Sequence, residues 1–254
     1  MREFMDYFGF LWELFKRDTK KKYYKSALGV VWTLLNPLLM MLVMTIVFST
    51  LFRRSIQFYP VYYLCAYLLL NFNSVTTTQA LHCLSSNAGL IRKIHVPQYM
   101  FCLATVGVNA FTMVISLLPL LLVALVIGVP LTPYVLLIPA PLLLTLLFTT
   151  GLSLVLSIVG VFFRDMNYLY HIITTLWVYA TPMFYPISII PQPYRFVWDL
   201  NPFYHYASMM RDVVLYGVMP SERTLLIATA YSVLMLITGI TVFRNYQDKI
   251  YLHL

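Results

Sequence analysis

The chain has 254 residues, of which 61% are hydrophobic and 10% are charged, and its net charge is +8. Soluble domains hold about 25% charged residues, so the charges here are too few to cover a water-facing globule. The composition excludes a soluble enzyme, a disordered tail and a secreted disulfide scaffold. It predicts an all-α integral membrane protein, with Cys65, Cys83 and Cys102 as small buried residues rather than disulfide partners.

Residues 1–25 predict a short helix that lies in the membrane interface and ends in a basic segment. Its aromatic and aliphatic side chains share one helical face, which suits the boundary between headgroups and acyl chains; they are Phe4, Phe8, Leu11, Trp12 and Phe15. The basic segment holds Lys20, Lys21, Lys22 and Lys25. Two interpretations stay open: an anchor that fixes the topology, or a cluster that binds an anionic lipid headgroup such as a pyrophosphate.

Six stretches are apolar and about 20 residues long, the length that a helix needs to cross a bilayer. They cover residues 32–52, 59–80, 100–127, 134–163, 168–185 and 225–243. Placing both termini in the cytoplasm puts most Lys and Arg residues on the inner side, as the positive-inside rule requires. We therefore expect six transmembrane helices in one domain spanning residues 1–254, with no cleavable signal peptide.

The second stretch carries tyrosines at a spacing of four residues and then a polar run. Tyr59, Tyr63 and Tyr67 precede Asn71, and Ser, Thr, Asn and Gln residues follow as far as Gln79. Such groups avoid lipid, so they either join helices through hydrogen bonds or line a water-filled conduit. Aromatic faces and hydroxyls would suit a sliding sugar chain. Most other tyrosines are assigned to the aromatic belts at the ends of spans.

Residues 87–97 form a short amphipathic segment between the second and third stretches. Asn87 is a candidate N-cap and Pro97 a stop signal. The segment is either an ordinary cytoplasmic turn or a rigid lever that docks into another protein. Asp165, between the fourth and fifth stretches, is a candidate N-cap for the fifth helix.

Prolines break the end of the fifth stretch and introduce a region that is too apolar for a free loop. Pro182 and Pro186 interrupt the helix, and Asn201 with Pro202 starts a new one that ends at Gly217. This helix is too short to span, so residues 186–217 predict either a re-entrant hairpin or a helix lying on the membrane surface.

The interiors of the six stretches hold no Asp, Glu, Lys or Arg. Apart from Tyr and Cys, their one titratable side chain is His171. Ion-coupled carriers and membrane-embedded hydrolases generally need such groups. The histidines are scattered, without a metal-binding spacing. We expect no catalytic residue, no metal and no cofactor in this chain, so that energy for any transport would come from another subunit.

The entry to the first stretch resembles that of type-2 ABC exporter permeases, in the branch that exports O-antigen, capsule or teichoic-acid polysaccharides. The motif combines a basic segment with Ser-x-Leu-Gly, Trp and Asn-Pro at fixed offsets, from Arg17 through Gly29 and Trp32 to Asn36-Pro37. The resemblance implies a homodimer in the bacterial inner membrane with two ATPase subunits, which bind ATP and Mg²⁺. It also implies extracytoplasmic gate helices at residues 186–217 and export of a lipid-linked polysaccharide.

The same resemblance makes residues 87–97 a coupling helix that sits in a cleft of the ATPase. Its candidate contact residues are Asn87, Gly89, Leu90, Ile91, Arg92, Lys93, Ile94 and His95. Family members often carry a basic residue after the proline, where this chain has Gln98. The alternatives are an ABC permease for a drug or small lipid, a gradient-driven carrier, and a membrane-bound transferase or lipid phosphatase.

Overall fold

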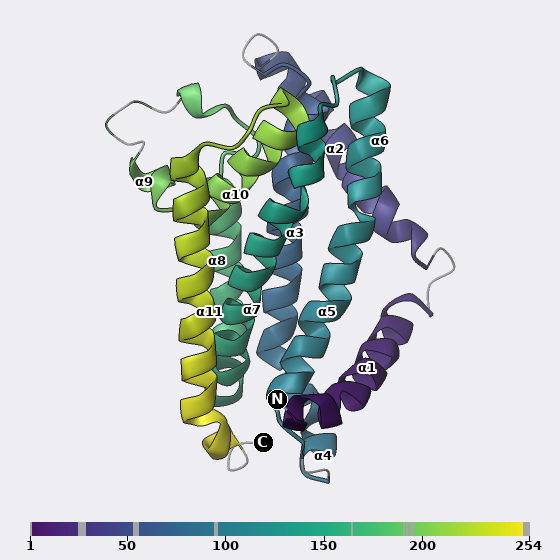
Figure 1. Ribbon diagram of the computed structural model, residues 1–254, viewed down its shortest axis with the longest axis vertical. Coiled ribbons are helices and arrows are strands. Elements are labelled where there is room, and N and C mark those ends of the chain that lie inside the picture. The colour runs from purple at the N-terminus through teal and green to yellow at the C-terminus, as the bar shows by residue number, and fades with distance from the viewer. Residues whose placement is uncertain are drawn as a thin grey trace.

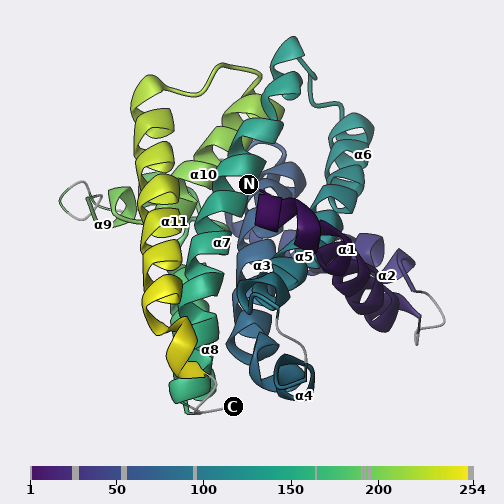
Figure 2. The ribbon, with the colours of Figure 1, turned by 60° about the horizontal axis from the view of Figure 1, so that its bottom comes forward.

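The computed structural model describes residues 2–24, 29–52, 56–93, 96–163, 165–189, 191, 193 and 196–250, without the side chains of residues 2–6, 49–52 and 197. Every regular element in these ranges is a helix. The long helices form an upright bundle, and α1 (Arg2–Tyr23) lies across its outside near one end (Figures 1 and 2). The expectation of an all-helical membrane protein is confirmed at this level.

Long helices occupy each of the six predicted stretches. They are α2 (Val31–Phe52), α3 (Tyr59–Cys83), α5 (Tyr99–Ile115) with α6 (Leu117–Ile127), α7 (Pro139–Phe162), α8 (Met166–Ala180) and α11 (Glu222–Ile250). Shorter elements connect them: η1 (Ser85–Asn87), α4 (Ala88–Ile91), η2 (Pro133–Leu137), η3 (Ile187–Ile189), α9 (Phe196–Asp199), α10 (Pro202–Arg211) and the π-helical turn η5 (Asp212–Tyr216).

Four helical segments of the described chain are long and apolar enough to cross a membrane by length and composition. They are Val31–Phe48, Tyr99–Ile127, Pro133–Phe162 and Glu222–Ile250. The two others fall short for different reasons: α3 carries the polar run, and the 15 residues of α8 extend only about 22 Å at 1.5 Å per residue. The count of six spans therefore stays a prediction.

The third stretch folds as two helices that meet at Ser116. The Ser116 hydroxyl donates to the Thr112 carbonyl at 2.9 Å, and Pro119, one turn later, brings no N–H to the helix. Both features bend helices, and α6 departs from the direction of α5 (Figure 1).

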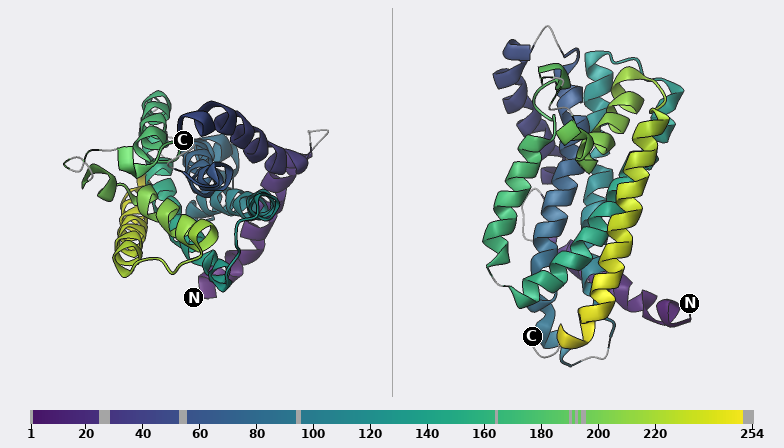
Figure 3. Two further views of the ribbon diagram at one scale, coloured as in Figure 1. Left: turned by 90° about the horizontal axis from the view of Figure 1, so that it is seen from above. Right: turned by 90° about the vertical axis from the view of Figure 1, so that its left-hand side faces the viewer.

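The centre of the bundle is α3, which packs against α2, α5, α7 and α10. The view from above shows these helices around it (Figure 3). Its buried side chains include both the tyrosine end and the polar end of the helix. Because protein covers most of α3, most of its polar side chains need not face lipid, which explains how a polar sequence occupies this position.

Glycines bring α7 against its two main neighbours. A Cβ added to Gly151 would collide with the backbone of α11 at Met235, and one added to Gly239 would collide with Gly151 itself. Gly160 meets the backbone of α3 at Leu81 in the same way. Small residues that let backbones touch are the usual means of tight helix association in membranes.

The predicted apolar face of α1 is not the side that packs most closely on the bundle, since its Leu11 and Phe15 are only half-buried. Two residues outside that prediction lie against the bundle: Leu14 is buried, and the ring of Phe10 packs edge-on against Phe101 of α5, with centroids 5.9 Å apart. Phe8 and Trp12 stay exposed. The helix thus docks on α5 while keeping aromatic side chains free for the membrane interface.

Two smaller predictions have opposite outcomes. Asp165 stands at the position before α8, but its side chain makes no capping hydrogen bond, so that predicted cap is wrong. The backbone there is helical rather than extended, and the carboxylate does not turn toward the first free N–H groups. The three cysteines are buried and free, as expected.

Candidate functional site

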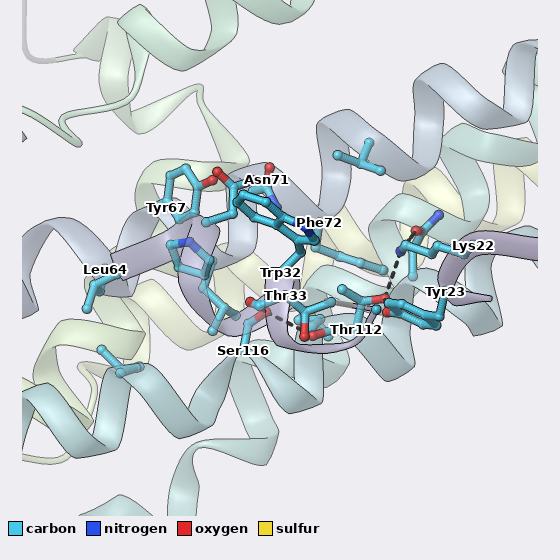
Figure 4. Close-up of a pocket in the computed structure, with 18 residues that line it drawn as sticks. Lys22, Tyr23, Trp32, Thr33, Leu64, Tyr67, Asn71, Phe72, Thr112 and Ser116 are labelled. Atoms are coloured by element: carbon cyan, nitrogen blue, oxygen red, sulfur yellow. Dashed lines mark hydrogen bonds between the residues drawn. The ribbon is translucent and has the colours of Figure 1, made fainter. Parts of the chain in front are cut away.

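A cavity of about 280 Å³ lies where the end of α1 meets α2, α3, α5 and α6 (Figure 4). Its wall combines the aromatic residues Trp32 and Tyr67 with the amides of Asn36 and Asn71. Lys22 lines it as well, and none of the described lining residues is acidic. The cavity therefore presents one cation, several hydrogen-bonding groups and aromatic faces.

Lys22 is held in place by α5. Its ammonium donates to Asn109 Oδ1 at 2.9 Å and to Thr112 Oγ1 at 2.8 Å, and the hydroxyl of Tyr23 lies 2.8 Å from the same Thr112 oxygen. Asn109 donates in turn to Gln79 Oε1 of α3 at 2.8 Å. Burial lowers the pKa of Lys22 to about 8, because no carboxylate compensates for the loss of water.

The other predicted headgroup lysines differ from Lys22. Lys20 and Lys21 are not among the residues that line the cavity, and the Lys20 nitrogen lies over the ring of Tyr24, 5.1 Å from the centroid. Lys25 lies outside the described residues. Among the lysines that the structure describes in this segment, it thus singles out Lys22 as the one that faces the cavity.

The predicted conduit tyrosines lie mostly inside the bundle. Tyr59 and Tyr63 are buried, and Tyr63 stacks on Tyr67 with ring centroids 5.3 Å apart. Tyr67 and Asn71 face the cavity of Figure 4 instead. In this arrangement Tyr63 forms no wall of an open passage, and a role for these residues in a conduit stays a prediction.

The polar run of α3 serves two purposes, one on each side of the helix. Inward, the hydroxyl of Thr149 donates to Asn73 Oδ1 at 3.1 Å and that of Tyr170 donates to Thr77 Oγ1 at 2.7 Å. These bonds join α3 to α7 and α8. Helix-to-helix hydrogen bonding therefore explains the inward half of the run.

Outward, the run forms an open groove of about 380 Å³ with α8. Its polar lining comes from the two helices in equal parts: Ser74, Thr78 and Gln79 from α3, and His171, Thr174 and Thr175 from α8. Sequence reasoning noticed the first three but could not pair them with the α8 residues. The signal was present, since His171 is the one imidazole within the predicted spans.

The predicted coupling segment lies at the same end of the bundle as α1 (Figure 1). Gly89, Arg92 and Lys93 are exposed and Leu90 is half-buried, whereas Ile91 is buried against the bundle. Ile91 thus anchors the segment and does not face a partner in this arrangement. Ile94 and His95 lie outside the described residues.

Asn87 does not cap α4, contrary to the prediction. Its amide donates back to the Cys83 carbonyl at 2.8 Å, and its Oδ1 accepts from Arg17 Nη2 at 3.0 Å. Because both polar atoms are used elsewhere, neither is left for the first turn of α4. The second bond connects α1 directly to the coupling segment.

Asn201 joins the two helices of the proline-rich region. It caps α10, as predicted, by accepting from Phe203 N at 3.0 Å, and the same oxygen accepts from Trp177 Nε1 at 2.9 Å. Its amide nitrogen donates to the Ala180 carbonyl at 3.2 Å and to Thr181 Oγ1 at 2.9 Å. One side chain therefore fixes the start of α10 to the end of α8.

The chain around the other predicted gate residues is enclosed by protein. Pro182, Pro186 and Pro202 are buried, and α10 packs against α3, α7 and α11. Arg211 of α10 is buried as well, with 5% of its surface exposed, because α10 is covered by protein on several sides.

Comparison with known proteins identifies the family of this chain. Residues 10–215 match the ABC-2 type transporter family. The chain is 29% identical to an O-antigen export system permease protein RfbA of Myxococcus xanthus, over 98% of this chain and 96% of that protein. It is 24% identical to a Klebsiella pneumoniae protein of the same name, over 95% of each chain. It is 21% identical to the polysialic acid transport protein KpsM of Escherichia coli, over 92% of each. Because the family match covers most of the residues, including those that form the cavity, the groove and α10, this chain belongs to the ABC-2 type transporter family.

Proposed function

We propose that this chain is the transmembrane permease subunit of an ATP-driven exporter. Its cargo would be an O-antigen-like polysaccharide linked to a lipid pyrophosphate, moved from the cytoplasmic to the outer face of a bacterial inner membrane. The observation that carries the proposal is similarity along nearly the whole chain to proteins named for O-antigen export and polysialic acid transport. ATP and Mg²⁺ would be bound by two partner ATPase subunits.

A homodimer of this chain would complete the passage. The groove between α3 and α8 is polar and open along one side, and lipid is a poor environment for its amide, imidazole and hydroxyl groups. A second copy related by a two-fold axis would cover both grooves at once. Hydroxyl-rich walls exchange hydrogen bonds with a sugar chain without holding one position, which favours sliding. With six spans, both termini would lie in the cytoplasm.

Loading would begin at the end where α1 and α4 lie. The Lys22 cavity offers a cation for an anionic headgroup, together with the faces of Trp32 and Tyr67 for a sugar ring. The exposed Arg92 and Lys93 would contact the ATPase. Since Arg17 ties α1 to Asn87 at 3.0 Å, a push on the coupling segment would also reach the helix that carries Lys22.

Transport in a defined system tests the proposal. Inverted membrane vesicles that contain this chain and its partner ATPase would receive a radiolabelled lipid-linked glycan on the outside. We expect ATP-dependent protection of the glycan from added glycosidase, abolished when the ATPase carries an inactive Walker motif. ATP-independent protection that follows a proton or sodium gradient would overturn it, as would protection that is unchanged in vesicles lacking this chain.

A further inference from the structure

The chain between α8 and η3 leaves its helix inside the protein, and its carbonyl groups need partners there. Residues 181–185 are neither helix nor strand, and Pro182, Met183 and Phe184 are buried. Non-helical backbone at membrane depth persists only where protein or water satisfies its polar groups. The hydrogen-bond partners of these carbonyls therefore decide whether residues 181–185 stay packed inside the protein.

Two tyrosines of α3 supply part of the answer. Tyr59 donates its hydroxyl to the Phe184 carbonyl at 3.2 Å. The Tyr62 hydroxyl lies within hydrogen-bond distance of two carbonyls, that of Pro182 at 3.2 Å and that of Tyr185 at 3.0 Å. These side chains therefore act as substitutes for the missing helical donors.

Arg211 of α10 adds a second donor to the Pro182 carbonyl and connects α10 to both α3 and residues 181–185. One terminal nitrogen donates to the Pro182 carbonyl at 2.7 Å, and Nε donates to the Tyr62 carbonyl at 3.3 Å. The guanidinium carbon lies 3.5 Å from the centroid of the Tyr62 ring. The rigid fork of the guanidinium makes these contacts together, which a lysine could not.

The bonding of Arg211 is suited to being broken and remade. No carboxylate of the described residues lies within 4 Å of its nitrogens, so its partners are neutral carbonyls and an aromatic face. A π-helical turn starts at the next residue, Asp212, and such turns recur at functional positions in helices.

We propose that Arg211 is a positioning residue for export: it clamps residues 181–185 against α3 and so keeps the outer end of the permease closed between transport events. Release of this clamp frees the proline-rich segment to move with α10. The role in closure rests on the proposed export function, while the clamp itself rests on the contacts of Arg211.

The native cysteines provide a local test. Cys65 is buried beside the clamp, with its sulfur 4.0 Å from the Met210 carbonyl. Cys83 and Cys102 are buried in the separate cluster at the other end of α3, with Leu14 and Ile250. The permease in proteoliposomes is treated with a membrane-impermeant maleimide, and the labelling rate of each cysteine is read by peptide mass spectrometry.

Arg211→Met keeps the length of the side chain but removes its donors. We expect labelling of Cys65 to accelerate about tenfold or more, the scale of lost hydrogen bonds to a charged group, with Cys83 and Cys102 unchanged. Arg211→Lys should give a smaller increase at Cys65. Arg223→Met is the matched control, because Arg223 is 77% exposed on the first turn of α11, and should label like the wild type.

Unchanged labelling of Cys65 in a folded Arg211→Met protein would overturn the clamp. Equal acceleration at all three cysteines would overturn it too, since that pattern indicates general loosening. Should Arg211→Met fail to fold, Arg211→Lys carries the same test, and no increase at Cys65 in that variant refutes the proposal. No cargo takes part in the labelling, so a failure of polysaccharide transport in vesicles is a separate result.

Discussion

Replacement of Asn201 by Ala should separate α10 from α8. The side chain is buried and has four partners: Trp177 Nε1 and Phe203 N donate to it, and it donates to the Ala180 carbonyl and the Thr181 hydroxyl. Alanine removes the N-cap and leaves the indole N–H of Trp177 without its acceptor.

The cost follows from these contacts. Loss of an Asn cap costs about 0.5–2 kcal/mol, and a buried donor left unsatisfied costs about 1–3 kcal/mol more. We therefore expect a loss of roughly 1.5–5 kcal/mol in the free energy of unfolding. Asn201→Asp should lose less of the cap, because a carboxylate still accepts from Phe203 N, but it adds a buried charge and gives up both donated bonds.

Reversible unfolding in mixed micelles measures this loss, with tryptophan fluorescence as the signal because Trp177 contacts the substituted residue. Asn245→Ala is the control, since Asn245 is an exposed amide on α11, and should change stability by no more than about 0.5 kcal/mol. An Asn201→Ala protein as stable as that control would refute the assignment of Asn201 as the joint between the two helices.

Three further outcomes follow from the geometry. Because the pKa of Lys22 is lowered to about 8, the side chain loses its charge as the pH rises through that value. Binding of a fluorescent pyrophosphate lipid should therefore weaken above about pH 8 in the wild type. The Lys22→Met variant should show no such step. The unfolded chain keeps that proton to higher pH, so loss of the proton from Lys22 makes the folded state more stable as the pH rises above about 8. A wild-type free energy of unfolding that falls over this pH range, with no such fall in Lys22→Met, would contradict the lowered pKa. Gly151→Leu should force α11 away from α7 and lower the free energy of unfolding by about 1–3 kcal/mol or more, measured by the same unfolding in micelles. The control is Gly89→Ala, at a position in open space, which should stay within about 1 kcal/mol of the wild type. Equal stabilities of the two variants would refute the close approach of α7 and α11. Thr78→Leu should reduce polysaccharide transport in vesicles without loss of folded protein, while Thr238→Leu on the exposed side of α11 should leave transport unchanged; the reverse order would exclude the groove from the passage.

The positions of the long helices were predictable because apolar length is a strong signal. All six predicted stretches contain helices, and the breaks at Pro182 and Asn201 lie where proline and capping chemistry put them. The number of spans was less secure. Hydropathy is calculated from one segment of sequence. The polar α3 is covered mostly by neighbouring helices, and the sequence of α3 alone does not show that these neighbours are there.

Most of what the sequence did not predict concerns the direction in which a side chain points. A lysine cluster is evident before α2, but only the fold shows that Lys22 turns toward Asn109. Tyr63 fits an inward stripe by spacing, yet it faces protein instead of a passage. Arg211 is a charged residue that the sequence gives no reason to bury, yet α10 is surrounded by protein on several sides and only 5% of Arg211 is exposed.

The polar character of α3 has a consequence for the synthesis of the protein. The chain emerges from its N-terminus, so α3 is made before α5, α7 and α10, three of the four helices that pack against it. At about 5–20 residues per second, its amides and hydroxyls wait several seconds for Thr149 and Tyr170 to reach them. For α3 to span the membrane as predicted, its insertion would depend on protein made later, and the helix would be held at the insertion machinery until then. Substitutions that make α3 more apolar would speed its insertion but would remove the hydrogen bonds that join it to α7 and α8. Membrane insertion and transport would therefore favour opposite sequences for the same helix.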